Sequence, residues 1–438
     1  MLSISRTALR LGRRARPLSA WAGVPSAPAD PIVGLNQTFA DDPSATKVLL
    51  GVGAYRDEQG KPYVLPSIRE AEARVVNGNP NHEYAAITGD AAFVKLSLDF
   101  AFGAECAPLQ EGRVAAAQVL SGTGGLRVAA ALLERLPRLK GEKQKPICYM
   151  PEPTWGNHAK VFQDAGVEVR RYRYLDTKTN TTLDYEGMKA DLLNAEAGST
   201  ILLHACAHNP TGVDPSPDQW RDLSSALKAT DLQLFFDCAY QGFASGDAER
   251  DALALRSFVA DGHEILLCQS YAKNFGLYGE RVGALSAVCK DPAEKAALES
   301  QLKAIIRPMY SSPPIHGARI VKEVLGDPAL RAQWTDECRA MAERIQAIRA
   351  LLREGLAKAG STRDWAHITD QIGMFAYTGL SKAQVQAMRD EFAVYCTLDG
   401  RISVAGLNTG NVDYVARAIH AVSELGKLLS ARASRRTP

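Results

Sequence analysis

The sequence lacks three features that would mark whole classes of protein. Its net charge is only +2 over 438 residues, so it has no basic excess of the kind that indicates nucleic-acid binding. No run of about 18 apolar residues occurs, which argues against a membrane-spanning helix. Neither the cysteines nor the histidines show a metal-ligand spacing, so we expect no metal site and no disulfide framework. The remaining composition, 46% hydrophobic and 23% charged, is typical of a soluble globular enzyme.

Acidic residues are also missing from the first 29 positions, which carry five arginines between Arg6 and Arg16. On a helical wheel, Ile4, Ala8 and Leu11 fall on the side opposite the arginines. An amphipathic, arginine-rich and acid-poor segment predicts a mitochondrial transit peptide over residues 1–20, and the mature protein in the mitochondrial matrix. A disordered basic tail is the alternative interpretation. Removal of the segment would make the net charge slightly negative.

Short apolar runs alternate with amphipathic helical stretches from about residue 60 to 325. This alternation predicts an α/β fold with a mostly parallel seven-stranded sheet flanked by helices. The helices include 126–136, 218–229 and 292–306. The predicted strands are Ala115–Leu120, Ile147–Met150, Val167–Arg173, Thr200–Ala205, Leu232–Phe236, Glu264–Cys268 and Gly283–Val288.

The rest of the chain has a different pattern. A long helical stretch covers 326–361, followed by short strands at 373–377 and 401–404 and a last helix from Val412. We therefore expect a second, smaller α+β domain that is built from both chain ends. The predicted division is an N-terminal arm and first part of the small domain over 21–62, a large domain over 63–340, and a small C-terminal domain over 341–438.

A lysine stands just after one of the predicted buried strands. Lys273 follows the apolar run Ile265–Cys268, with Ser270 before it and Arg281 after it. Ligands of open α/β sheets bind at the carboxyl ends of the strands, and a serine and an arginine there could hold an anion. An amine beside an anion site suits an enzyme that holds a phosphorylated aldehyde as a Schiff base. An ordinary lysine on a surface turn is the alternative.

Other predicted strands end in groups suited to the same cofactor. Asn209 opens an Asn-Pro-Thr-Gly turn, and Asp237 follows Leu-Phe-Phe, with Tyr240 three residues later. An aspartate in a poorly hydrated place needs a partner, and a pyridinium nitrogen supplies one. The glycine-rich segment 121–125 is predicted to be a turn that opens a helix and offers N–H groups to a phosphate. Each feature alone is also typical of a plain turn or cap, but together they indicate one site.

The motifs around these residues are long enough to carry a family resemblance. The chain resembles the mitochondrial aspartate aminotransferases, which are fold-type I pyridoxal phosphate enzymes, over roughly residues 21 to 424. It departs from the family pattern after Tyr84 and after Arg307. The matching segments include Gly51-Val-Gly-Ala-Tyr-Arg56, Ser121-Gly-Thr-Gly, Pro153-Thr-Trp-Gly-Asn-His158, His204-Ala-Cys-Ala-His-Asn-Pro-Thr-Gly212, Phe236-Asp-Cys-Ala-Tyr-Gln-Gly-Phe243, Gln269-Ser-Tyr-Ala-Lys-Asn274 and Gly400-Arg-Ile-Ser-Val404.

The resemblance implies a role for each matching residue. Lys273 would bind the cofactor covalently and move the proton, Asp237 would pair with the pyridine nitrogen, and Tyr240 would donate to the phenolic oxygen. His158 and His204 would surround Asp237, and the bonds before Pro153 and Pro210 would be cis. The cofactor-binding set is completed by Gly122, Thr123, Trp155, Asn209, Ser270, Arg281 and, from the neighbouring subunit, Tyr84. The substrate-binding set is Gly53, Trp155, Asn209, Arg401 for the α-carboxylate, and Arg307 for the distal carboxylate, lent by the partner subunit.

These roles imply a homodimer that transfers an amino group between L-aspartate and 2-oxoglutarate by a ping-pong mechanism through Lys273. Two guanidinium groups can bind both carboxylates of a dicarboxylic amino acid, which favours aspartate and glutamate as substrates. Three alternatives remain. Ser270-x-x-Lys273 also matches a serine acyl-enzyme motif, although no Lys-Thr-Gly accompanies it. The chain could be a binding protein on the same fold, or an aminotransferase that also accepts aromatic or kynurenine-type substrates.

Overall fold

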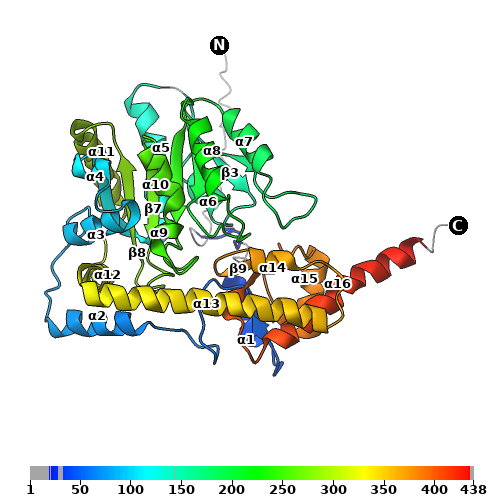
Figure 1. Ribbon diagram of the computed structural model, residues 1–438. Coiled ribbons are helices and arrows are strands. Elements are labelled where there is room, and N and C mark those ends of the chain that lie inside the picture. The colour runs from blue at the N-terminus through cyan, green and yellow to red at the C-terminus, as the bar shows by residue number, and fades with distance from the viewer. Residues whose placement is uncertain (1–18, 20, 28–32, 143, 435–438) are drawn as a thin grey trace, which may run out of the picture.

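The computed structural model describes residues 19, 21–27, 33–142 and 144–434, and a seven-stranded sheet forms its centre (Figure 1). The strand order is β2-β8-β7-β6-β5-β3-β4, and among these strands only β8 runs against its neighbours. The prediction of a mostly parallel seven-stranded sheet is therefore confirmed. The strands are β2 Val114–Leu120, β3 Ile147–Glu152, β4 Glu168–Arg173, β5 Thr200–His204, β6 Gln233–Cys238, β7 Leu266–Ser270 and β8 Val282–Val288.

Helices cover both faces of this sheet, because its central strands are apolar on both sides. Two successive residues of β6 point to opposite faces of the sheet, with Phe235 in one apolar core and Phe236 in the other. The first core lies under α5 Ser121–Leu139, α6 His158–Gln163 and α11 Pro292–Met309. The second core lies under α3 Ala91–Phe102, α7 Tyr185–Leu193, α8 Pro217–Leu227 and α10 Leu253–Ala260.

Both chain ends meet in a second, smaller unit beside the sheet. The N-terminal β1 Val48–Leu49 pairs in parallel with β10 Val394–Tyr395, and β9 Phe375–Tyr377 pairs with β11 Arg401–Ser403. Its other elements are α1 Val33–Asp41, α14 Ala366–Asp370, α15 Lys382–Phe392, the 3₁₀ turn η1 Val404–Gly406 and α16 Val412–Ser434. The remaining helices are α2 Pro66–Asn77, α4 Ala107–Gln110, α9 Ala248–Asp251, α12 His316–Gly326 and α13 Pro328–Lys358.

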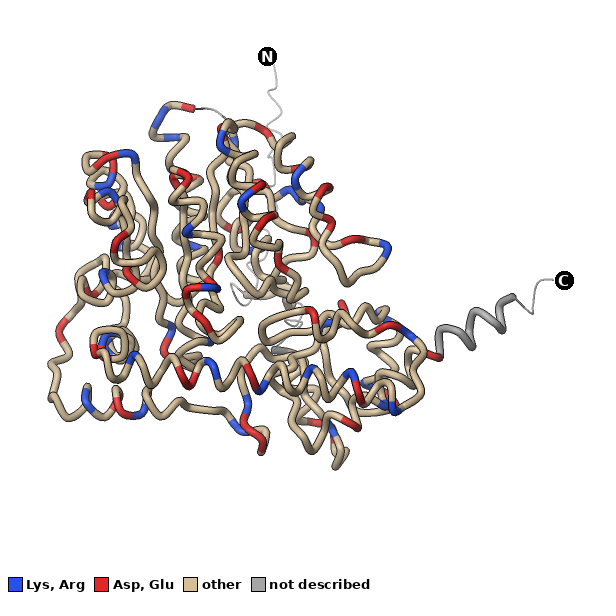
Figure 2. Tube along the Cα trace, in the orientation of Figure 1, with Lys and Arg blue, Asp and Glu red and all other residues tan. Residues whose placement is uncertain are grey.

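The long helix α13 joins the two units (Figure 1). The domain boundary expected at residues 340 and 341 falls inside this continuous helix, so α13 would belong to both domains, and the division itself stays a prediction. The expected transit segment, residues 1–20, lies outside the described residues except for Ser19. Basic and acidic residues are interspersed over the described chain (Figure 2), and no helix in that part is long and apolar enough for a membrane crossing.

Two local predictions were wrong. The glycine-rich segment is not a turn before a helix, because α5 already begins at Ser121. Glycine is needed here for space: a Cβ on Gly125 would lie 2.4 Å from Cys268 Sγ, so the helix packs directly against β7. Asp237 does not follow its strand but lies within β6, where it pairs with Cys268 of β7. The bonds before Pro153 and Pro210 are cis, as expected.

Candidate active site

A pocket opens at the carboxyl ends of the parallel strands and collects most of the predicted site residues. The segments after β2, β3, β5, β6 and β7 each contribute side chains to its wall. Such an edge is where open α/β sheets bind ligands, because loops from several strands converge there. The predicted residues that line it are Gly122, Thr123, Trp155, Asn209, Asp237, Tyr240, Ser270, Lys273 and Arg281.

One end of the pocket is built to accept an anion. The first turn of α5 lies in the wall at Gly122 and Thr123. The first N–H groups of a helix have no intrahelical acceptor, and no side chain caps them here, so they are available to a ligand. The hydroxyls of Ser121 and Ser270 share a hydrogen bond of 2.9 Å beside this turn. Arg281 adds a positive charge. A helix N-terminus, two hydroxyls and a guanidinium form a donor set suited to a phosphate.

A chain of hydrogen bonds fixes the proton positions around Asp237. The backbone N–H of Asn209 donates to His204 Nδ1 over 3.3 Å, and burial lowers the pKa of His204 to about 3, so His204 is neutral and carries its proton on Nε2. This Nε2 donates to Thr154 Oγ1 (3.1 Å), and the Thr154 hydroxyl donates to His158 Nδ1 (2.8 Å). His158 Nε2 therefore carries the proton that it donates to Asp237 Oδ2 over 3.2 Å.

This arrangement keeps Asp237 ionised inside the protein. Burial alone would raise the pKa of the carboxyl, but the hydrogen bond from His158 and the nearby charge of Lys273 outweigh burial and hold the pKa below its ordinary value. The sequence pointed to both histidines and missed Thr154, which connects them. A threonine directly before Trp155 has no sequence signal that would single it out.

Lys273 and Tyr240 face each other across the pocket. Lys273 Nζ lies 5.4 Å from the centre of the Tyr240 ring. Burial lowers the pKa of Lys273, with help from the charges of Arg281 and Arg401, while Asp237 opposes the shift. Burial also raises the pKa of the Tyr240 phenol, which therefore stays protonated. The pocket thus holds an amine that loses its proton more easily than usual and a phenol that keeps its own.

Arg401 lies next to the pocket and is a buried cation. Its side chain is buried, donates from Nη1 to Asn209 Oδ1 (3.1 Å) and from Nη2 to Gly51 O (2.7 Å), and leaves Nε without a partner. The guanidinium carbon lies 4.2 Å from the centre of the Phe375 ring. No carboxylate in the described chain forms an ion pair with it. A buried guanidinium without an anion is costly, and a ligand carboxylate would supply the missing charge.

Gly53 has a steric reason to be glycine. A Cβ at this position would lie 2.7 Å from Phe375 Cζ, so a side chain would displace the ring that packs against Arg401. Gly53 does not line the pocket itself. Sequence reasoning missed Phe375, because an aromatic residue in a short strand has the ordinary pattern of a core residue.

Two predicted residues are not brought to the pocket by a single chain. Tyr84 is 85% exposed, and Arg307 lies at the exposed end of α11, where it donates to the hydroxyl of Ser311. Neither lines the pocket. The sequence assigned both to a neighbouring subunit, and that assignment stays a prediction.

Comparison with known proteins identifies a family and close relatives. The family model "Aminotransferase class I and II" matches residues 45–419. The chain is 50% identical to the mitochondrial aspartate aminotransferase of Dictyostelium discoideum, over 92% of this chain and 93% of that protein, and 50% identical to that of Xenopus tropicalis, over 93% and 94%.

Solved structures of aminotransferases have the same fold as this chain. An aromatic-amino-acid aminotransferase from Burkholderia pseudomallei, covalently bound to pyridoxal phosphate, superposes with a TM-score of 0.88 at 44% identity, covering 92% of this chain and 100% of that one. A mitochondrial aspartate aminotransferase from Trypanosoma brucei superposes with a TM-score of 0.85 at 43% identity, covering 89% and 100%.

Proposed function

The chain belongs to the class I and II aminotransferases, which makes it a pyridoxal phosphate-dependent enzyme, and we propose that it transfers the amino group between L-aspartate and 2-oxoglutarate, yielding oxaloacetate and L-glutamate. The observation that carries this proposal is the buried, anion-free guanidinium of Arg401 next to the pocket of Lys273 and Asp237. Relatives that are 50% identical over nearly the whole chain carry the name aspartate aminotransferase.

The residues of the pocket fit pyridoxal phosphate. The uncapped first turn of α5, Ser270 and Arg281 would hold the phosphate, Asp237 would pair with the ring nitrogen, and Lys273 would bind the aldehyde carbon. When bound, this cofactor supplies an electron-withdrawing ring that stabilises negative charge on the substrate carbon. Trp155 also lines the pocket, and we assign it to the face of the ring.

The chain's own residues supply the proton chemistry. The ionised Asp237, held by His158, would favour a protonated ring nitrogen on the bound cofactor. Lys273 has a lowered pKa, so its neutral amine can accept a proton from the substrate Cα and deliver it elsewhere. Tyr240 stays protonated and would be able to donate a hydrogen bond to the bound ring, and Asn209 helps to hold Arg401. The catalytic set that we propose is therefore Lys273, Asp237 and Tyr240.

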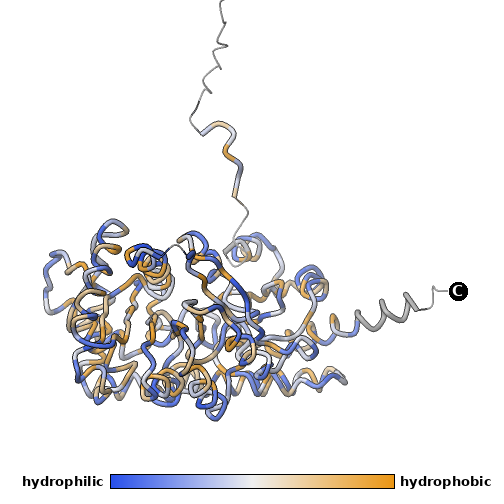
Figure 3. The backbone as a smooth tube through the Cα atoms, turned by 90° about the horizontal axis from the view of Figure 1, so that it is seen from above, coloured by the Kyte–Doolittle hydropathy of each residue, from blue (hydrophilic) through white to orange (hydrophobic). Residues whose placement is uncertain are grey.

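Two arginines would select dicarboxylic substrates. Arg401 would bind the α-carboxylate and Arg307 the distal one, each through a fork of N–H donors. We propose that Arg307 and Tyr84 reach the pocket of a second copy of the chain in a homodimer. Three facts support this: both residues are exposed on a single chain, neither lines its own pocket, and residues 21–27 stand clear of the body with Trp21 80% exposed (Figure 3).

We place the enzyme in the mitochondrial matrix. The arginine-rich, acid-poor N-terminal segment supports import into the mitochondrion, and the names of the curated relatives include "mitochondrial". Fusion of residues 1–30 to a fluorescent protein tests the targeting part. The fusion is expected to enter the matrix, and a diffuse cytosolic signal would contradict the proposal.

A substrate panel tests the proposed activity. Purified protein loaded with pyridoxal phosphate is offered aspartate, glutamate, phenylalanine and kynurenine, each with 2-oxoglutarate or oxaloacetate as the acceptor that completes the reaction. We expect the dicarboxylic amino acids to have the highest kcat/KM. An aromatic substrate that reacts faster than aspartate would show that the enzyme instead resembles the aromatic-amino-acid neighbour in activity.

A further inference from the structure

Arg349 is a buried cation that no acidic residue neutralises. It lies on α13, is fully inaccessible to solvent, and forms no ion pair within the described chain. Its guanidinium instead donates to three backbone carbonyls: Nη1 to Ile368 O (2.7 Å), and Nη2 to Gly373 O (2.9 Å) and to Phe375 O. Burial lowers the pKa of Arg349 to about 9, which leaves it charged at neutral pH.

The three carbonyls explain why a charged residue is kept there. Ile368 lies in the last turn of α14, Gly373 in the irregular segment that follows, and Phe375 at the start of β9, so these buried carbonyls lie where regular backbone pairing ends or begins. A guanidinium offers several N–H groups in a fixed plane and can bind several carbonyls at once. Arg349 thus sets the shape of residues 368–375 in a way that an apolar side chain could not.

This segment in turn contacts the two groups that hold Arg401. The ring of Phe375 packs against the Arg401 guanidinium at 4.2 Å, and the Phe375 carbonyl is one of the three that Arg349 binds. The N–H of Ile372 donates to Gly212 O over 2.8 Å, which ties the segment to the turn that begins at Asn209. Asn209 Oδ1 accepts from Arg401. Arg349 is therefore connected to Arg401 along two paths, one through Phe375 and one through the turn that begins at Asn209.

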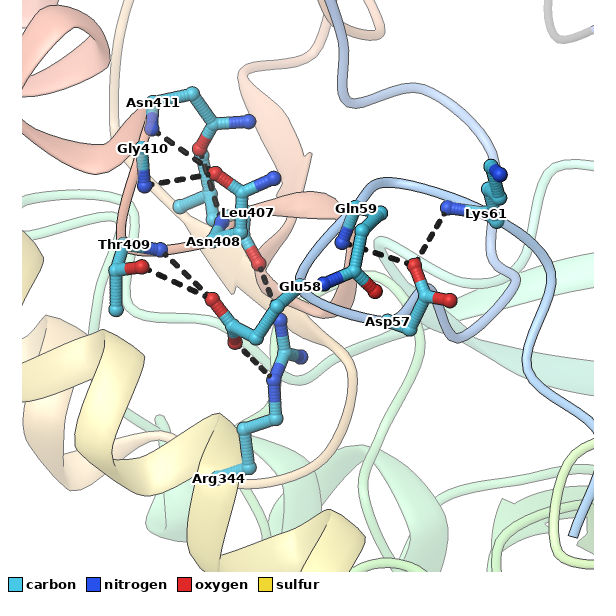
Figure 4. A network of polar contacts seen from close by, with 10 residues as sticks. All are labelled: Asp57, Glu58, Gln59, Lys61, Arg344, Leu407, Asn408, Thr409, Gly410 and Asn411. Atoms are coloured by element: carbon cyan, nitrogen blue, oxygen red, sulfur yellow. Dashed lines mark hydrogen bonds and ion pairs between the residues drawn. The ribbon is translucent and has the colours of Figure 1, made fainter.

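A second arginine of α13, Arg344, joins two other segments of the chain (Figure 4). Arg344 Nε pairs with Glu58 Oε1 at 2.6 Å, and its Nη2 donates to Leu407 O over 3.1 Å. Glu58 also accepts from the backbone N–H of Thr409. These bonds join the strand-to-loop segment after Gly53 with the segment after Arg401. Arg344 has a carboxylate partner, whereas Arg349 contacts only carbonyls, so the two differ in what they fix.

We propose that Arg349 is a positioning residue for the substrate carboxylate: it fixes residues 368–375 so that Phe375 and the Asn209 turn hold Arg401 in its binding orientation. This inference rests on the proposed role of Arg401. Arg349 touches neither substrate nor cofactor. Its loss should therefore weaken carboxylate binding and leave the cofactor half of the pocket unchanged.

The test uses the holoenzyme with Arg349→Lys and Arg349→Gln, which keep a donor but lose the planar fork. Arg339→Lys is the matched control, because Arg339 is an exposed arginine of the same helix, α13, and its side chain pairs with Asp336 of that helix. The dissociation constant of succinate, a dicarboxylate that cannot react, is measured by calorimetry together with KM and kcat for aspartate. The absorption of the bound cofactor is recorded for every variant.

The Arg349 variants are expected to bind succinate about tenfold more weakly, the factor that corresponds to about 1.4 kcal/mol. KM for aspartate should rise in parallel, while kcat and the cofactor spectrum stay close to those of the parent. The control should match the parent. Lower thermal stability with unchanged succinate affinity would show a purely structural role and overturn the proposal.

Phe375→Leu keeps the proposal testable if the Arg349 variants do not fold. It leaves the backbone carbonyl for Arg349 in place but removes the ring at Arg401, and it should also weaken succinate binding. Unchanged binding in this variant would refute the path through Phe375. Where both variants fold, the double variant should lose less than the two single effects added together, and full additivity would refute the path.

Arg401→Lys separates this inference from the proposed function. If Arg401→Lys leaves succinate binding intact, Arg401 is not the carboxylate site and the proposed function fails. If Arg401→Lys abolishes binding while the Arg349 variants bind normally, only the positioning role fails.

Discussion

Arg401 and Arg307 are assigned to the two carboxylates of one substrate, yet the chain holds them in different ways. Arg401 is buried, donates two hydrogen bonds and packs against an aromatic ring, so its orientation is set before a ligand arrives. Arg307 is exposed in the last turn of α11, and its side chain donates to the hydroxyl of Ser311 just after that helix. Arg401 is therefore oriented by its own chain, whereas the role proposed for Arg307 needs a second copy of the chain.

The same contrast separates the inner and outer halves of the whole site. The inner half, with Lys273, Asp237 and the first turn of α5, is assembled by strand ends of one sheet. The outer half, with Tyr84 and Arg307, is exposed on a single chain. We therefore expect a single chain to supply most of the cofactor site, whereas the proposed selection of a dicarboxylic substrate needs a second copy.

The largest effect is expected from Lys273→Ala in the inner half. Loss of the amine removes the group that moves the proton at the substrate Cα, so aspartate turnover should fall by more than about 10⁴-fold. Turnover is followed by coupled oxaloacetate reduction. Lys303→Ala, at an exposed position of α11, serves as the control and should retain full activity. Comparable activity in the two variants would contradict the role of Lys273.

Arg307→Ala should have a large effect that depends on the substrate. Losing the charge pair with the distal carboxylate should cost ~2–5 kcal/mol, roughly 30- to several-thousand-fold in kcat/KM for aspartate. Alanine and other neutral amino acids should be little affected. Arg401→Ala should instead impair every amino acid, since all carry the α-carboxylate. If aspartate turnover barely changed in Arg307→Ala, the role given to Arg307 would be wrong.

Mixing two inactive variants tests whether the outer half comes from a second copy. A heterodimer of Lys273→Ala and Arg307→Ala chains contains one site with both defects and one site with neither. After subunit exchange, aspartate turnover should return to about a quarter of the parent level, since half of the dimers are mixed and each has one intact site. No recovery in a mixture shown to contain heterodimers would mean that each site takes Lys273 and Arg307 from the same chain, which would refute the shared arrangement.

The smallest effect concerns stability without the cofactor. Because burial lowers the pKa of Lys273 below 10.5, the unfolded chain binds more protons than the folded one between the folded pKa and 10.5. The stability of the cofactor-free protein should therefore rise with pH through this window. Lys273→Met should show a shallower rise in chemical denaturation at several pH values. Parallel curves for the two proteins would mean that the Lys273 amine is not desolvated.

Much of the inner half could be predicted from the sequence. All seven central strands were located, because most are apolar runs bounded by polar residues, and parallel strands bring their carboxyl ends to one edge. Lys273, Asp237 and Asn209 were singled out for that reason. The start of α5 was missed because glycine normally opposes helix formation, whereas packing against Cys268 requires it here.

The residues that support Arg401 and Asp237 could not be predicted in this way. Arg349 lies in a long amphipathic helix, where a charged residue is expected on the solvated face, and its partners are carbonyls that have no sequence signal. Phe375 and Thr154 act through contacts with residues far away in the chain. Such roles depend on the tertiary arrangement, and only the folded chain reveals them.

The absorption spectrum of the purified protein with pyridoxal phosphate tests the central claim most directly. Bound cofactor should give a band in the visible to near-ultraviolet range that shifts when aspartate is added and returns when 2-oxoglutarate is added. Such a cycle would establish the cofactor and both half-reactions in one cuvette. A protein that stays colourless after incubation with pyridoxal phosphate, or a band that ignores aspartate, would contradict the account.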